Sequence, residues 1–338
     1  MPRIALSISV FLLAAASLSL PAQTPPPTSE DVPAPSVASD LSNLALGPAR
    51  RLEFEGALER HDFQRAETIL LEESKRDPHS PHAARLLEAA GSLFFLDGQY
   101  LDAAIAWKRA EAIAPLALRS RFTLAMTYIK LGRSDWARLE LEKLATTQPA
   151  SPLYLYWLAR LDYDAQSYAA AIGRLQKVVE LDSGMMRAHD LLGLCHDYLG
   201  HFDKAIESYA RAVELNRLQA KPSPWPLVDM SISLVAVNRL AEAEKNLREA
   251  LNDDDRLPQA HYQLGRVLEM QQQDPAAIQS LNRAVALDST YPEPHYLLGR
   301  VYQRLGEAGL AKTEIERFKQ LTKSRDALAL PPSQPPTQ

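Results

Sequence analysis

Cysteine is almost absent from this chain of 338 residues, and Cys195 is the only one. No disulfide can form within the chain, so its stability must come from the packing of apolar side chains. An excess of positive charge is also missing, because the formal net charge is −5. Nucleic-acid-binding surfaces are usually basic, so this charge balance predicts no nucleic-acid partner.

The motifs of common enzyme chemistries are missing as well. The sequence contains no G-x-x-x-x-G-K, G-x-G-x-x-G, G-x-S-x-G or H-E-x-x-H. His189, His261 and His295 recur at one place of a repeated unit, so the repeat explains them without a shared metal site. Cys195 lies near His189 and His196, but its helical spacing favours a small buried residue over a zinc ligand. We therefore predict a non-enzymatic protein with no catalytic residue, metal or cofactor.

The first 22 residues have the pattern of a secretory signal peptide. Arg3 supplies a positive charge, residues 4–20 are apolar apart from four serines, and small residues lead to Ala22. The alternative is an uncleaved anchor, although the apolar stretch is at the lower limit for spanning a bilayer. No cysteine lies near the cleavage point for lipid attachment. We predict a periplasmic or secreted protein without a transmembrane segment after cleavage.

Proline-rich segments flank the central part of the chain. Residues 23–46 include QTPPPTSEDVPAPSVASD, and residues 326–338 end in LPPSQPPTQ. Such a composition buries too little apolar surface to offset its ordering entropy, so we predict a disordered linker and a disordered tail. Apolar residues make up 46% of the whole chain, and we expect them to form a core within residues 47–325.

The central part repeats with a period of 34 residues. A four-residue insertion near residues 220–223 is the one interruption. A small residue marks each unit, at Gly91, Ala125, Ala159, Gly193, Ser231, Gly265 and Gly299. An alanine follows each of these after twelve residues, from Ala103 to Ala311. A fixed period of this size predicts a stacked array.

Each unit predicts two helices. In residues 186–219, apolar residues recur at helical spacing on both sides of Gly200. Gly98, Gly132 and Gly306 share the register of Gly200, where a positive φ would end the first helix. Small residues allow two helices to cross closely, and neighbouring pairs then share a continuous core.

The period of 34, with Gly or Ala at the eighth position of most units, Ala at the twentieth and often Ala at the twenty-seventh, resembles the tetratricopeptide repeat (TPR). Residues 260–288 and 294–318 are close to its consensus. The resemblance implies an all-α, right-handed superhelical solenoid of about seven to eight helix-turn-helix repeats. The implied units are 84–117, 118–151, 152–185, 186–219, 224–257, 258–291 and 292–325, preceded by a degenerate unit near 47–80 that lacks a clean first helix.

The resemblance also implies a scaffold in the cell envelope that binds a peptide or protein partner on the concave face. In this family the first helix of each unit lines that face. The implied contact residues are Phe95, Phe122, Met126, Tyr156, Arg160, Tyr163, Trp225, Tyr262, Arg266, Tyr296 and Arg300. The apolar residues of this set would form apolar stretches on the concave face. The Tyr–Arg pairs, four residues apart on one helix face, would contact carboxylates or aromatic rings of the partner.

The sequence leaves several alternatives open. The Tyr and Arg side chains can instead pack against neighbouring units, and residues 23–46 can fold over the apolar stretch. The solenoid can also self-associate as a structural element, or serve as an adaptor subunit of an envelope enzyme complex. The partner and the oligomeric state are undetermined by the sequence.

Overall fold

The computed structural model describes residues 44–329, and within that range the chain forms helices and no strands. The helices are α2 (Pro48–Glu59), α3 (Phe63–Ser74), α4 (Pro81–Leu96), α5 (Tyr100–Glu111), α6 (Leu118–Lys130), α7 (Ser134–Thr147), α8 (Pro152–Asp164), α9 (Tyr168–Leu181), α10 (Met186–Tyr198), α11 (Phe202–Asn216), α12 (Trp225–Ala236), α13 (Leu240–Asp253), α14 (Pro258–Met270), α15 (Asp274–Leu287), α16 (Pro292–Arg304) and α17 (Ala308–Ala329). They form sequential pairs, from α2 with α3 to α16 with α17. The predicted all-α solenoid of about eight repeats is confirmed.

A residue with positive φ follows the first helix of each pair. Four are glycines with φ of 74°, 68°, 72° and 79°, at Gly98, Gly132, Gly200 and Gly306. The same register in the other pairs holds His61, Gln166, Asn238 and Gln272, with φ of 55° to 61°. A side chain in this conformation costs about 1 kcal/mol. The repeated feature is therefore the left-handed turn itself, which half of the pairs adopt without glycine.

Small residues lie where the two helices of a pair cross. A Cβ atom added to Gly193 would come within 2.5 Å of the Tyr209 ring, and one added to Gly91 within 2.8 Å of the Trp107 ring. At Gly265 the added atom would be 2.6 Å from a Leu281 side-chain atom. These distances are shorter than ordinary van der Waals contact, so large side chains fill the space left by each missing Cβ.

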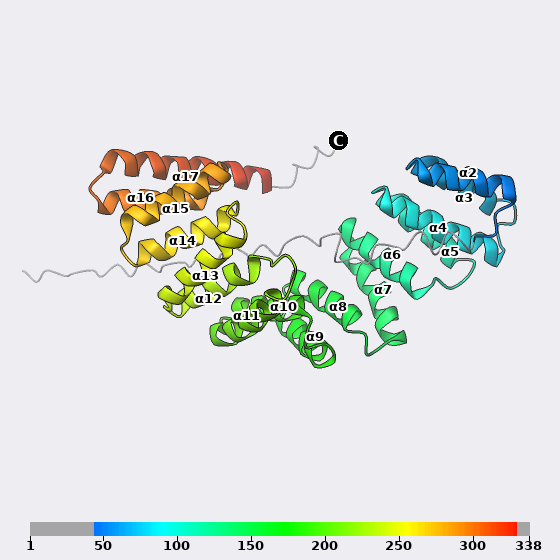
Figure 1. Ribbon diagram of the computed structural model, residues 1–338, viewed down its shortest axis with the longest axis horizontal. Coiled ribbons are helices and arrows are strands. Elements are labelled where there is room, and N and C mark those ends of the chain that lie inside the picture. Colours follow the sequence, from blue (N-terminus) through cyan, green and yellow to red (C-terminus); the bar gives the residue numbers. More distant parts are fainter. Residues whose placement is uncertain (1–43, 330–338) are drawn as a thin grey trace, which may run out of the picture.

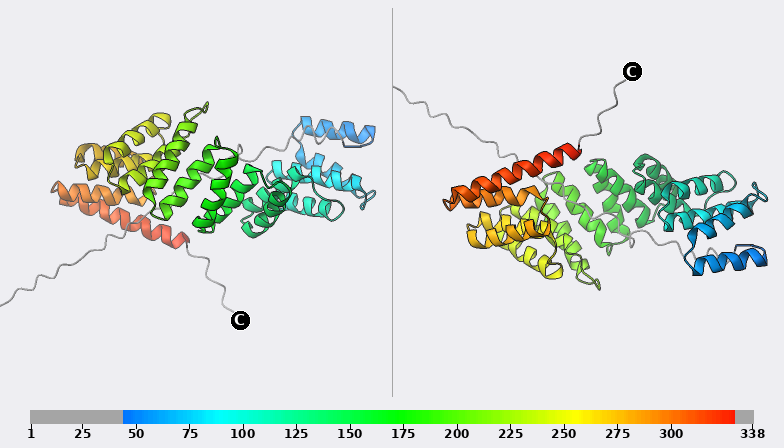
Figure 2. Two further views of the ribbon diagram at one scale, coloured as in Figure 1. Left: turned by 90° about the horizontal axis from the view of Figure 1, so that it is seen from below. Right: turned by 90° about the horizontal axis from the view of Figure 1, so that it is seen from above.

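The pairs stack side by side into an arc whose two ends, α2 and α17, lie on the same side (Figure 1). Figure 2 shows the stack from below and from above, with each helix pair beside the next. Even-numbered helices contact one another across pairs, as α10 does with α8 and α12. Among the described helices, no odd-numbered pair makes such a contact. The even-numbered helices are thus closer together and line the inner side of the arc.

The ends of the solenoid differ from the predicted boundaries. Leu44 and Leu46 are buried against the first helix pair, so the predicted linker at 23–46 does not extend through these residues. Helix α2 is complete, although the sequence indicated no clean first helix there. Helix α17 continues to Ala329, past the predicted end at 325. The predicted signal peptide and the remaining parts of the linker and tail lie outside the described residues.

Candidate functional site

The apolar residues predicted on the inner face are mostly packed inside the solenoid. On α6, Phe122 is 4% exposed and Met126 is 2% exposed, and both belong to the largest core cluster. Phe95 on α4 is half-buried, with its ring centre 6.4 Å from that of Trp107. Trp225, at the start of α12, is also half-buried. Phe95 and Trp225 are therefore the members of this group that keep surface for a partner.

The predicted residues of α8 are held by neighbouring side chains. Tyr156 is buried, and this burial raises its pKa to about 12. Arg160 pairs with Asp164 at 3.2 Å on the same helix. Tyr163 is buried too, with its ring centre 5.7 Å from that of Tyr198 on α10. Tyr156 and Tyr163 thus stabilise the packing around α8 and offer little free surface.

The predicted row of Tyr and Arg side chains forms on α14 and α16. Tyr262 lies within electrostatic reach of both Arg266 and Arg300, which act against the rise in its pKa caused by burial. Tyr296 is 44% exposed. Arg300 is exposed but lies 3.2 Å from the carboxylate of Glu269, the kind of structural pairing that the sequence left open. Contact of this row with a partner stays a prediction.

Buried carboxylates near these helices have arginine partners. Glu269 on α14 is 3% exposed, and its Oε1 accepts a hydrogen bond of 2.9 Å from Arg304 and lies 3.2 Å from Arg300. Asp162 on α8 is 4% exposed and accepts hydrogen bonds of 2.7 and 2.6 Å from two arginines. Such pairing offsets the large cost of removing a carboxylate from water.

Three aspartates come together between α10 and α12 without arginine pairs of this kind. Asp190 and Asp197 are two turns apart on one face of α10. Ser233 on α12 donates a hydrogen bond of 2.6 Å to Asp197. Asp229, one turn before Ser233, interacts electrostatically with both aspartates of α10. We call Asp190, Asp197 and Asp229, together with Tyr209 on α11, the acidic pocket.

The carboxyl groups of the acidic pocket are unequally satisfied. Asp197 accepts from the Tyr209 hydroxyl at 3.0 Å and from Ser233 at 2.6 Å. Asp229 is 3% exposed and has no hydrogen-bond partner among residues 44–329. Asp190 keeps some exposed surface, but its Oδ1 is buried without a hydrogen bond inside the described part of the chain. Buried polar atoms are normally paired, so the Oδ1 of Asp190 is an unmet acceptor.

Burial raises the pKa of every carboxyl group in the pocket. The pKa of Asp190 rises to about 7, against a smaller opposing effect of Arg160, and that of Asp197 rises to about 6. The pKa of Asp229 rises well above its ordinary value, because desolvation is reinforced by Asp190 and Asp197. Burial therefore favours the protonated form of these carboxyl groups, and an approaching cation would oppose this effect.

The acidic pocket was missed by reasoning from the sequence. The available signal was Asp190 and Asp197, seven residues apart on the first helix of one unit. Asp229 gave no signal, because its approach to α10 depends on how two units stack.

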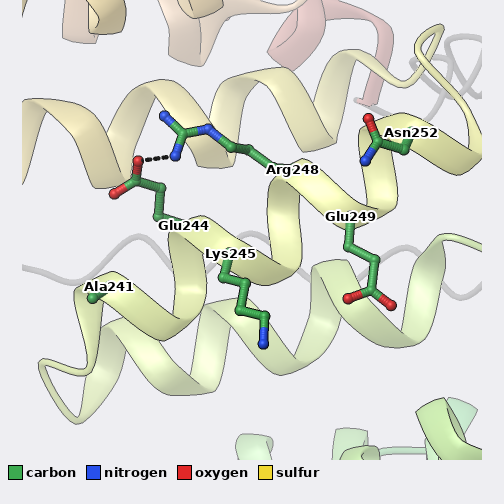
Figure 3. A pocket seen from close by; sticks show the side chains of 6 residues that line it. All are labelled: Ala241, Glu244, Lys245, Arg248, Glu249 and Asn252. Atoms are coloured by element: carbon green, nitrogen blue, oxygen red, sulfur yellow. Dashed lines mark ion pairs between the residues drawn. The ribbon is translucent and has the colours of Figure 1, made fainter.

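A shallow hollow on α13 is a weaker candidate. It is lined by Ala241, Glu244, Lys245, Arg248, Glu249 and Asn252, and Figure 3 shows that all six side chains come from this one helix. Arg248 pairs with Glu244, and Glu249 accepts a hydrogen bond of 2.6 Å from Arg217. Most charges of the hollow are therefore already paired within the chain.

The cysteine and two of the repeat histidines have structural roles. Cys195 is fully buried, as predicted, and burial raises its pKa to about 12. His189 and His261 each contact a backbone carbonyl six residues earlier, at 3.1 and 3.0 Å. Within residues 44–329, no three His, Cys, Asp or Glu side chains are grouped to hold a metal ion, and no helix is long and apolar enough to cross a membrane.

Comparison with known proteins agrees with this architecture. Residues 270–306 match the family model of the TPR repeat, and residues 137–212 match that of anaphase-promoting complex, cyclosome, subunit 3. No curated protein matches the sequence.

Several solved structures share the fold at low sequence identity. A tetratricopeptide repeat protein from Parabacteroides merdae is 16% identical, with a TM-score of 0.56 over 78% of this chain and 99% of that one. Cut9 and Hcn1 form an APC/C hetero-tetramer, whose matching chain is 16% identical with a TM-score of 0.57, covering 78% of this chain and 51% of that one. PilF from Pseudomonas aeruginosa is 15% identical, with a TM-score of 0.54 over 60% of this chain and 91% of that one. The fold of this chain is that of a TPR solenoid.

Proposed function

We propose that this chain is a non-enzymatic scaffold that binds a peptide or protein segment along the inner face of its solenoid. The observation that carries the proposal is the run of even-numbered helices from α8 to α16, which contact one another across pairs inside an open arc. That side of the arc combines half-buried Tyr262 and Arg266 on α14 and exposed Tyr296 and Arg300 on α16 with the unpaired Oδ1 of Asp190 on α10. An extended segment can satisfy such groups along its length.

The inner face is tested by site-specific photo-crosslinking in the native host. A benzophenone amino acid replaces Arg266 on α14 or Tyr296 on α16. Matched controls replace Gln279 on α15 and Lys312 on α17, which are exposed on the outer helices of the same two units. We expect Arg266 and Tyr296 to crosslink to a common protein and the controls to give none. Crosslinks confined to Gln279 and Lys312 would contradict an inner binding face.

We also propose that the scaffold works in the periplasm or outside the cell. The support is the n-region, apolar stretch and small residues of positions 1–22. Mass spectrometry of the protein purified from its host should find an N-terminus near Gln23. A chain that retains Met1 in the cytosolic fraction would contradict export.

A further inference from the structure

The acidic pocket combines a deeply buried carboxyl group, Asp229, with an unpaired carboxyl oxygen of Asp190 on the neighbouring inner helix. Asp229 is 3% exposed and has no hydrogen bond among the described residues, and the buried Oδ1 of Asp190 likewise has none. Desolvating a carboxyl group without a partner is destabilising. Packing does not require this arrangement, because Glu269 and Asp162 are equally buried and are each bound by two arginines.

The repeat positions that hold arginines at the α14–α16 junction hold other residues at the α10–α12 junction. Asp197 and Glu269 occupy the twelfth position of their units. Glu269 is paired by Arg300 and Arg304, which are the ninth and thirteenth residues of the following unit. The corresponding residues after Asp197 are Ile232 and Ala236. Asp197 therefore lacks the arginine partners that the same fold provides two junctions further along, although Arg160 acts electrostatically on Asp190.

We propose that the acidic pocket receives the cationic end of a lysine or arginine side chain from a peptide lying on the inner face. The unpaired Oδ1 of Asp190 offers an acceptor, Asp229 lies within electrostatic reach of it, and Asp197 is oriented by Tyr209 and Ser233. Asp190 is partly exposed on an inner helix, which gives the side chain its way in. This inference rests on the proposed peptide-binding function.

The structure favours an organic cation from another molecule. Asp190 and Asp197 are about 10 Å apart along α10 by helix geometry, and no three ligating side chains of residues 44–329 are grouped for a metal. A long flexible cation suits this spread better than a small ion that needs close convergent oxygens. The chain's own flanking segments, residues 23–43 and 330–338, contain no lysine or arginine.

The first test measures the pocket without any knowledge of the partner. The full chain is labelled with [4-¹³C]aspartate, and the resonances are assigned with Asp190→Asn, Asp197→Asn and Asp229→Asn. n-Butylguanidinium or n-butylammonium chloride is titrated at constant ionic strength, with tetramethylammonium chloride as the control. We expect saturable shifts of Asp190 and Asp229 with the first two salts, and at least tenfold weaker binding to Asp229→Asn. Unchanged resonances overturn the proposal, and so does saturation by calcium chloride in place of the alkyl cations.

The second test connects the pocket to peptide binding. Displayed random peptides are selected on the wild-type chain and on Asp190→Asn/Asp229→Asn, which keeps the side-chain shapes and whose folding is checked by circular dichroism. We expect wild-type peptides to share one required Lys or Arg, and citrulline at that position to weaken binding at least tenfold. The double variant should bind the Arg and citrulline peptides equally.

The two hypotheses fail differently in these tests. Peptides selected without any required cation would overturn the lysine or arginine assignment while supporting the proposed function. If alkyl cations bind but no peptide is ever selected, the proposed function fails, and the peptide as source of the cation fails with it.

Discussion

Two junctions of the solenoid, α10 with α12 and α14 with α16, are built from the same repeat. They differ in the charge of the side chains that surround a buried carboxyl group. Glu269 is 3% exposed between two arginines, whereas Asp229, also 3% exposed, has two further aspartates as electrostatic neighbours. The difference comes from a few inner-face positions that do not affect the small-residue pattern. A repeat scaffold can thus keep one backbone and vary the chemistry of each junction independently.

Removing the arginine pairing at the α14–α16 junction should produce the largest effect. Arg304→Met should destabilise this end by about 3 kcal/mol, because the buried Glu269 keeps only the half-exposed Arg300 and Asp274 also loses its arginine. Urea unfolding by circular dichroism, with hydrogen exchange of α14 amides, measures the loss. Arg317→Met on exposed α17 surface is the control and should change stability by less than about 0.5 kcal/mol. Equal behaviour of the two variants would show that the pairing is not stabilising.

A second prediction compares the helix crossings of the same two regions. Gly193→Ala should destabilise by about 2 kcal/mol, because its Cβ meets the ring of Tyr209, which is fixed by Asp197. Gly265→Ala should cost about 1 kcal/mol, since Leu281 can change rotamer more easily. Thermal unfolding of the two variants gives the comparison. A larger loss for Gly265→Ala would mean that Tyr209 is not rigidly held.

Much of this fold could be predicted from the sequence because its determinants are local and periodic. Gly193 and Gly265 mark helix crossings, and Gly98 and Gly200 mark turns. Their regular spacing is visible within this single sequence. Exceptions such as Gln166 with φ of 58° were not visible, because packing of the flanking helices imposes the turn on a residue that does not favour it.

The binding residues were harder to predict because burial depends on how neighbouring units stack. Phe122 and Tyr163 carry inner-face positions in the repeat, yet both are buried by adjacent helices. Arg300 fits a ligand-binding pattern and also pairs with Glu269. Asp229 lies beside Val228, outside the expected contact positions, and becomes notable only next to Asp190.

A third prediction removes one charge from the acidic pocket. The raised pKa of Asp229 means that the native state binds its proton more tightly than the unfolded chain. Its contribution to stability is present below the unfolded pKa and is lost as pH rises through the folded pKa. Asp229→Asn should therefore be about 1–2 kcal/mol more stable than wild type at pH 8, with little difference at pH 4.

Urea unfolding across this pH range measures that difference. The groups facing Asp229 are Asp190, Asp197 and Tyr209, so their titration shapes the same curve. Asp182→Asn, at the end of α9, is the control for a general effect of charge. A destabilised Asp229→Asn at pH 8 would indicate that the carboxylate has a stabilising partner.

The smallest expected effect comes from adding to the α10–α12 junction an arginine like the one at the α14–α16 junction. Ala236→Arg places a guanidinium at the repeat position of Arg304, two units earlier, and Ala236 is exposed enough to accept it. The added charge should approach Asp197 and raise stability at pH 8 by about 0.5–1 kcal/mol, since the pair is partly solvated. Combining it with Asp197→Asn should remove the gain, which separates pairing from a change in helix propensity. If the gain survives in the double variant, Ala236→Arg acts through the helix alone, and the two junctions differ by more than their arginines.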